Sequence, residues 1–309
     1  MFSSLRRGKK LYKPLQSLLD PSRGFFSNRG GYQHFGAPKG PKKRWFPSQG
    51  TVICIGVAGG ATFEKTTRDA NKQGALYPQH ARECERVRGI GLKIANVAAN
   101  GKGGGFLDHM KGIKWEYAVI RSEEPDAFVA PGGKVVVYTG LLDMVGGNDD
   151  QLAAVLAHEA GHTLARHVGE KLTLRSFSIL AFFLIYAATG FPIPDGLLAG
   201  AIELPNSRKL ESEADAIGLK LAAQACYNPD SAVQVFEKFN QIEKKFGADR
   251  IPGFLRTHPM NDARIAAIQK NLPAAHELYE ASGCRQKESV FRAAFGQQWS
   301  SRRDDSGFF

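Results

Sequence analysis

The sequence contains little cysteine. Four cysteines occur among its 309 residues, and no two of them form a Cys-x-x-Cys pair, which excludes a cysteine-rich zinc cluster. Cys226 and Cys284 flank the carboxyl-terminal helical part, and they can form a disulfide only if this part faces an oxidising compartment. Two buried free thiols are the alternative.

Negative charge is almost absent from the amino-terminal segment. Residues 1–47 contain one acid, Asp20, and eleven basic residues, so they carry +10 of the chain's net +11. A basic segment with serines and hardly any acids is typical of a mitochondrial presequence or matrix-facing arm, to which we assign residues 1–44. A nucleic-acid-binding tail is the alternative. We expect no nucleic-acid partner, because nothing else in the chain resembles a nucleic-acid module.

No apolar run reaches the length of about twenty residues that a membrane-spanning helix needs. Residues 45–63 are uncharged but short and rich in glycine, and we predict that they form a single membrane anchor. A buried segment of the soluble domain is the alternative. Residues 177–202 form two apolar arms that Pro192 and Pro194 separate. Each arm is too short to span with ease, so a hairpin that contacts the membrane competes with a buried helix pair.

The sequence does contain half of a catalytic zinc site, His158-Glu159-Ala160-Gly161-His162. Residues four apart lie on one face of a helix, so both imidazoles can reach one metal ion, and Glu159 can take a proton from a water molecule there. Asn148 is a suitable cap for this helix. A bare motif of this kind also arises by chance, and a histidine on an apolar helix face is more often a core residue.

A zinc hydrolase needs a third protein ligand. The segment Glu211-Ser212-Glu213-Ala214-Asp215 begins another helix, and Glu211 and Asp215 again share one face. We predict that Glu211 binds the metal and that Asp215 hydrogen-bonds the outer nitrogen of a ligand histidine. Glu213 is expected to be a solvated surface charge.

The two motifs together resemble the HtpX and CAAX-prenyl-protease clan of zinc endopeptidases, most closely its mitochondrial Oma branch. The similarity covers roughly residues 75–275 and includes Asp126–Leu141, Ser207–Glu211 and the Thr257-His258-Pro259 segment. Asp126 departs from the pattern, because the family usually has asparagine there. We expect this change to leave the zinc site untouched and to alter the nearby loop.

The residues before the zinc helix favour a small antiparallel sheet, with apolar runs at 119–120, 128–129 and 135–138 separated by turn-forming residues. In peptidases of the resembled type, an edge strand beside the cleft can hold an extended substrate. We assign this role to Phe128, Val129 and Ala130. The alternative is a plain hydrophobic sheet.

The resemblance adds two further site residues. In the family, the histidine that corresponds to His258 lies over the active site, where it can stabilise the oxyanion or approach the metal, and Arg264 supports it. By itself, a His-Pro pair is more often an ordinary loop. His167 is expected to continue the zinc helix, away from the metal face, as a structural residue.

We therefore predict an α+β, mostly helical protein with a zincin-type metallopeptidase domain at 64–284, preceded by the arm and anchor and followed by a polar tail at 285–309. The resemblance implies one Zn²⁺ per chain and cleavage of proteins anchored in the mitochondrial inner membrane, for quality control or in response to stress. The catalytic domain would contact lipid and face the intermembrane space. A zinc-binding scaffold or assembly factor with a latched cleft is the alternative function. The sequence leaves undecided whether the protein forms a homo-oligomer.

Overall fold

The computed structural model describes residues 49–100, 110, 112–191, 204–246 and 252–285. The expected arm at 1–44 and all but the first residue of the expected tail at 285–309 lie outside this range. The expected anchor at 45–63 lies partly outside it. Helix α1 begins within that segment and runs over Gln49–Lys72, well past its expected end. The anchor therefore stays a prediction.

The sheet has three strands, β1 (Glu116–Ile120), β2 (Ala127–Ala130) and β3 (Lys134–Tyr138). Strand β3 lies in the middle, antiparallel to β2 and parallel to β1. The expectation of an antiparallel sheet throughout was therefore wrong for one of the two pairings. The hairpin β2–β3 pairs with β1 through β3, which places the Val135-Val136-Val137 run at the centre and leaves β2 as an edge.

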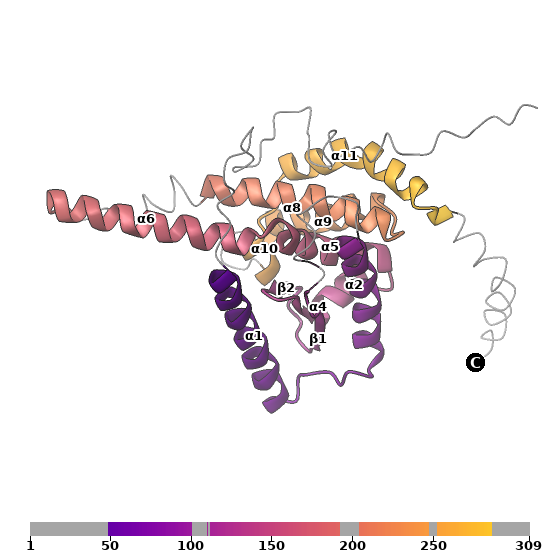
Figure 1. The fold of residues 1–309 in the computed structure, drawn as a ribbon. Coiled ribbons are helices and arrows are strands. Elements are labelled where there is room, and N and C mark those ends of the chain that lie inside the picture. Colours follow the sequence, from indigo (N-terminus) through magenta and orange to yellow (C-terminus); the bar gives the residue numbers. More distant parts are fainter. Residues whose placement is uncertain (1–48, 101–109, 111, 192–203, 247–251, 286–309) are drawn as a thin grey trace, which may run out of the picture.

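Helices cover both faces of the sheet (Figure 1). Because successive side chains of a strand point to opposite faces, Val136 packs toward α1 with Ile120 and Ala70. Val135 and Val137 point the other way, into the main core formed with α2 (Arg82–Asn100) and α5. The sheet is thus an inner layer of the domain.

Helix α5 (Asp149–Ala165) is the central helix of the domain. The side chain of Asn148 accepts a hydrogen bond from the backbone N–H of Gln151 at 3.0 Å, which confirms the expected cap. Nearly every residue of α5 is buried, which explains the dense apolar run on either side of its histidines. The short helix α4 (Thr139–Val145) leads from β3 into it.

The remaining helices pack around α5. Helix α8 (Leu204–Gln224) makes its most extensive contact. Helix α9 (Asp230–Phe246) also packs against α5, and α11 (Asp262–Ala281) packs against α8 and α9. The short helix α10 (Gly253–Thr257) lies between α9 and α11 in the chain. A disulfide between Cys226 and Cys284 joins the segments that follow α8 and α11. The mostly helical fold with a small sheet before the zinc-motif helix is thus as predicted.

Helix α6 (His167–Thr189) is unlike the other helices, because it extends away from the domain (Figure 1). Its large apolar side chains are exposed, including those of Phe177, Phe183 and Leu184. It is the one helix, among the described residues, that is long and apolar enough to cross a membrane. The first apolar arm was expected to begin at Phe177, whereas the helix starts ten residues earlier, at His167. The helix that carries the first arm is therefore neither short nor buried, and the second arm, which ends at residue 202, lies outside the described residues.

Candidate metal centre

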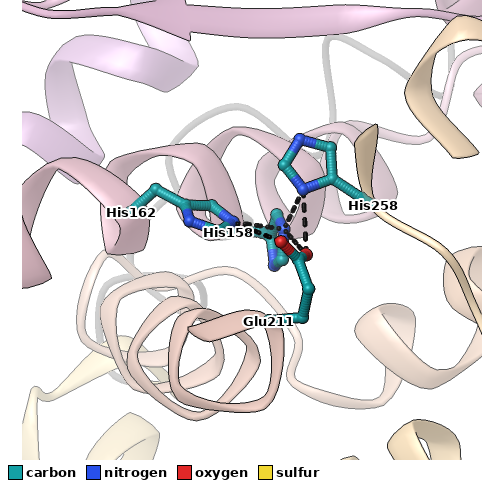
Figure 2. Close-up of side chains that lie close together, drawn as sticks. All are labelled: His158, His162, Glu211 and His258. Carbon is teal, nitrogen blue, oxygen red and sulfur yellow. Dashed lines mark hydrogen bonds and ion pairs between the residues drawn. The ribbon is translucent and has the colours of Figure 1, made fainter. Parts of the chain in front are cut away.

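Helix α5 brings the two motif histidines together. Because His158 and His162 lie one turn apart on the same face, their Nε2 atoms approach to 3.1 Å. Both rings are buried, and so is the carboxyl group of Glu159 beside them. Figure 2 shows both rings pointing from this helix toward one common point.

Helix α8 supplies the carboxylate opposite the histidines. One oxygen of Glu211 lies 3.4 Å from Nε2 of His158, and the other lies 3.5 Å from Nε2 of His162. Asp215, one turn further along α8, places Oδ1 3.0 Å from Nδ1 of His158. Among the described residues this nitrogen has no partner in hydrogen-bond alignment, so the Asp215 contact is short but not linear. The structure thus brings all four of these predicted residues together.

His258 adds a third nitrogen, and with it a fourth candidate ligand atom, to this group. It directly follows α10, and its backbone N–H donates to the carbonyl oxygen of Phe254 at 2.8 Å. Its Nδ1 lies 2.9 Å from Glu211 Oε2 and 3.3 Å from His158 Nε2 (Figure 2). Its other ring nitrogen, Nε2, lies 3.3 Å from Oε1 of Glu159. One imidazole therefore contacts both the ligand cluster and the expected general base.

The spacing of these atoms fits a small tetrahedral metal ion. Zinc bonds to nitrogen and oxygen measure about 2.1 Å, which places tetrahedral ligand atoms about 3.4 Å apart. Four residues each offer one ligand atom, and these atoms all lie within 4.8 Å of one another: His158, His162, Glu211 and His258. The distances between their ring nitrogens and carboxylate oxygens given above are 2.9–3.5 Å. Oε1 of Glu211 is buried without a hydrogen-bond partner among the described residues, as expected of an atom that a metal satisfies.

The charge of the site also suits a divalent cation. Three carboxyl groups, those of Glu159, Glu211 and Asp215, are buried close to a single buried guanidinium, that of Arg264. With neutral histidines, this leaves a net negative charge in a region where unpaired charge is costly. A doubly charged cation at the histidine nitrogens would balance it.

The pKa values show the same preference for a cation. Burial lowers the pKa of His158, but the Asp215 and Glu211 carboxylates outweigh burial and raise it to about 9. Burial lowers the pKa of His162 to about 3, and the neighbouring His158 adds to this effect. Burial also raises the pKa of Glu211, yet the three histidines hold it well below its usual range. The cluster therefore keeps Glu211 ionised and His162 neutral, as a metal site requires.

Arg264, on α11, connects its own helix with Asp215 on α8 and with the segment that carries His258. Its Nε and Nη2 donate to the two carboxylate oxygens of Asp215 at 2.8 and 2.7 Å, a paired geometry that orients both groups. Its Nη1 donates to the carbonyl oxygen of Pro259, next to His258, at 2.7 Å. Burial lowers the pKa of Arg264, but Asp215 outweighs this and raises it. Arg264 thus holds Asp215 and the His258 segment together, and its contacts place it behind the ligands.

The predicted substrate strand lies directly beside the expected general base. The backbone N–H of Val129, in the middle of β2, donates to Oε2 of Glu159 at 3.2 Å. Phe128 and Val129 are half-buried, whereas Ala130 is buried. The edge position of β2 leaves one side of this strand free of strand partners among the described residues. The structure therefore places this edge strand directly beside Glu159.

Two interactions escaped the sequence analysis. Oε1 of Glu124, in the loop before β2, accepts hydrogen bonds from the backbone N–H of Gly253 and from Nη2 of Arg256, at 2.7 and 2.8 Å, and so ties α10 to the sheet. His167 does not continue α5 as expected. Arg166 adopts a left-handed conformation (φ 60°), which ends α5 and turns the His167 ring back against His162. No pattern in the sequence marks either contact, since both depend on where the chain reverses.

Comparison with known proteins identifies the family. Residues 106–272, more than half of the chain, match Peptidase family M48. The chain belongs to Peptidase family M48. The mitochondrial metalloendopeptidase OMA1 of Saccharomyces cerevisiae is 36% identical over 244 residues, which cover 77% of this chain and 69% of the relative. The protein of the same name from Schizosaccharomyces pombe is 42% identical over 177 residues, which cover 57% of this chain and 52% of the relative.

A more distant relative is the beta-barrel assembly-enhancing protease of Escherichia coli, 28% identical over 233 residues, or 71% of this chain and 46% of the relative. Membership of Peptidase family M48 confirms the predicted resemblance and the predicted enzyme class, a zinc metalloendopeptidase. The cluster of His158, His162, Glu211 and His258 is able to hold a metal ion.

Proposed function

We propose that this protein is a zinc endopeptidase of the mitochondrial inner membrane that cleaves membrane-associated proteins. The observation that carries the proposal is the convergence of His158, His162 and Glu211 beside the buried carboxyl group of Glu159. The two yeast relatives support the mitochondrial part, since both are named mitochondrial. The role in quality control and stress-responsive processing that the family resemblance implies is part of the same proposal.

Each residue has a distinct task in peptide hydrolysis. Zinc, when bound by His158, His162 and Glu211, supplies a Lewis acid that polarises a carbonyl group and acidifies water. Glu159 takes a proton from the attacking water and delivers it to the leaving amine. Asp215 lies against Nδ1 of His158, which keeps Nε2 directed at the metal, and Arg264 keeps Asp215 in place.

Strand β2 supplies the binding edge. A peptide that pairs with β2 as an additional strand would run past Val129, whose N–H contacts Glu159. Main-chain pairing of this kind recognises an extended segment and places few demands on its side chains. We therefore propose that the substrate is an unfolded or extended stretch of a protein, held by Phe128, Val129 and Ala130.

His258 keeps the site closed in this conformation. Its Nδ1 stands at the fourth corner of the ligand group, where a zinc hydrolase keeps an open position for water, and its Nε2 contacts Glu159. His158, Glu159, Glu211 and His258 are all buried, so a peptide cannot reach them without displacing His258. We propose that this is the resting state. The same observation favours the second candidate function, a zinc-binding scaffold or assembly factor whose cleft stays latched.

Helix α6 supports the membrane part of the proposal. Its 23 residues extend about 35 Å, enough for a hydrocarbon core of about 30 Å. Exposure of Phe177, Phe183 and Leu184 to water would be costly, whereas lipid would cover them. Only Arg166 separates α6 from the helix that carries the metal ligands. A membrane at α6 would therefore bring membrane-anchored substrates close to the site.

The Cys226–Cys284 disulfide supports the proposal that the peptidase domain faces the intermembrane space. Disulfides persist in oxidising compartments and are rare where thiols are kept reduced. The intermembrane space, rather than the matrix, would then contain the peptidase domain, with the basic residues 1–44 on the matrix side.

The peptidase and the scaffold predict different outcomes for the full chain in lipid vesicles. With zinc present, the wild type should cleave a membrane-anchored protein that carries an unfolded segment, and Glu159→Gln should lose cleavage but keep zinc. The same substrate without its anchor should be cleaved more slowly. Zinc binding without cleavage of either substrate, even when His258 is replaced, would reject the peptidase and favour the scaffold.

A separate experiment tests α6. In a chain shortened to residues 64–309, which lacks the expected anchor at 45–63, the double variant Ile179→Asp/Phe183→Asp should be released from vesicles in alkaline carbonate, because charge in the hydrocarbon core is unfavourable. Leu92→Asp is the matched control, since Leu92 is also an exposed apolar residue but lies on α2. Equal retention of the double variant and the control would contradict membrane insertion by α6.

A further inference from the structure

The outer nitrogens of the two motif histidines have different partners. Nδ1 of His158 faces a carboxylate, that of Asp215. Nδ1 of His162 faces another imidazole instead, because Nδ1 of His167 lies 2.8 Å from it. The two rings meet edge to face, with centroids 4.9 Å apart, and both are buried.

His167 in turn contacts a carboxylate on α8. Its Nε2 lies 3.4 Å from Oε2 of Glu213, whose side chain is only 14% exposed. Glu213 is two residues from Glu211 and therefore points to another face of α8. From the sequence, we expected a solvated charge at Glu213 and a purely structural His167. The structure instead connects Glu213, His167 and His162 in a row.

Hydrogen-bond chemistry fixes the direction of this row. His162 can bind a metal through Nε2 only if its proton is on Nδ1, since a neutral imidazole has one N–H and one lone pair. That N–H must then donate to Nδ1 of His167, because the two atoms are 2.8 Å apart and share one proton. The proton of His167 is consequently on Nε2, which is the atom that faces Glu213.

We propose that His167 and Glu213 are positioning residues for the ligand His162. The carboxylate of Glu213 holds the tautomer of His167, and His167 holds the tautomer and ring angle of His162, as Asp215 does for His158. This inference rests on the proposed metal site. Outer partners of this kind commonly change metal affinity about 10- to 100-fold when they are removed.

The test measures the zinc dissociation constant of the full-length protein in detergent by competition with a chelator. His167→Phe keeps an aromatic ring but removes the acceptor, so zinc binding should weaken about 10- to 100-fold. His167→Asn should retain most of the affinity, because its amide oxygen can accept the hydrogen bond of His162. Glu213→Ala should weaken binding less than His167→Phe, and the double variant should be no weaker than His167→Phe alone.

The matched control is His276→Phe. His276 also pairs with a carboxylate, Nε2 lying 3.1 Å from Oδ1 of Asp230, but this pair is about half-exposed. The control should bind zinc as the wild type does. A purely structural role for His167 predicts something else, a lower melting temperature of the zinc-free protein with an unchanged dissociation constant.

The outcomes separate this inference from the proposed function. If the wild type binds no zinc, the proposed function fails as well. If the wild type binds zinc and cleaves protein, but His167→Phe binds zinc as tightly, only the positioning role is rejected. Additive effects of His167→Phe and Glu213→Ala would also reject it, because residues that act through one another are not additive.

Discussion

Gly218 on α8 lies directly against the backbone of His158 on α5. A methyl group at Gly218 would come within 2.7 Å of the His158 amide nitrogen. Gly161 on α5 approaches α8 in the same way, since a methyl group there would lie 2.9 Å from the carbonyl oxygen of Ala214. The two ligand-bearing helices can therefore come together only because these positions lack side chains, and this close approach sets the distance from the histidines to Glu211.

Gly218→Ala should consequently damage both stability and metal binding. The added methyl must push α8 away from α5, at a cost of about 1–3 kcal/mol in the free energy of unfolding, and it moves Glu211 out of range. Denaturant unfolding and chelator competition measure the two effects. Gly89→Ala on α2 is the control, because Gly89 is exposed with nothing within 4 Å of the added methyl, and this substitution should stabilise slightly. Unchanged zinc affinity in Gly218→Ala would contradict the role of the close contact.

Asp126 should make the protein less stable as the pH rises. Burial raises the pKa of Asp126 to about 6, and the nearby Glu124 and Glu159 carboxylates add to the rise. Between the ordinary aspartate pKa near 4 and this value, the folded state binds more protons than the unfolded state, so stability falls with rising pH. Asp126→Asn removes this loss. Above pH 6 it should stabilise by about 1–2 kcal/mol, allowing for partial exposure, and the gain should vanish below about pH 4.

Unfolding curves of wild type and Asp126→Asn from pH 4 to pH 8 measure this difference. A gain that is independent of pH would show that the asparagine acts through packing and not through its lack of charge. The substitution also restores the residue that is usual in the resembled family.

The disulfide should contribute about 2–4 kcal/mol to the free energy of unfolding. Cys226 and Cys284 are 58 residues apart, and a cross-link of this span mainly restricts the unfolded chain. Replacing both by serine should lower the melting temperature to that of the reduced wild type, and a reducing agent should then have no further effect. A reduced wild type that melts at the same temperature as the oxidised one would contradict the cross-link.

His258→Ala should increase basal cleavage. The ring occupies the corner expected for water and contacts Glu159, so its loss opens the site. If the contacts of His258 with Glu211 and Glu159 stabilise the closed site by about 1.4 kcal/mol, their loss should raise the cleavage rate of an unfolded protein about tenfold. Zinc binding should become somewhat weaker. A fall of about 100-fold or more would instead assign His258 to the oxyanion and remove the resting-state account.

Much of the candidate site was predictable from sequence because its spacing is local. The i, i+4 pairs in His158/His162 and Glu211/Asp215 follow directly from helix geometry. The pairing of the two segments came from the need of a zinc hydrolase for a third protein ligand. The place of His258 and Arg264 came from family resemblance and not from any local rule. Their meeting in space depends on helix packing across about fifty residues.

The remaining features depend on backbone reversals and on pairing choices. The left-handed Arg166 returned His167 to His162, and no proline or glycine marks this turn. The parallel pairing of β1 with β3 depends on which side of the hairpin docks, and residue alternation leaves this undetermined. The first apolar arm was expected to begin at Phe177 because the charges before it, including Arg175, interrupt the apolar run, whereas helix α6 continues through them.

The most direct test of the account is the metal content of the purified full-length protein, with Glu211→Ala and Glu213→Ala measured in parallel. Elemental analysis should find about one zinc per chain in the wild type, little or none in Glu211→Ala, and a reduced but measurable amount in Glu213→Ala. Well-folded wild-type protein that binds zinc in no stoichiometric amount, or Glu211→Ala that retains it fully, would contradict the proposed metal centre.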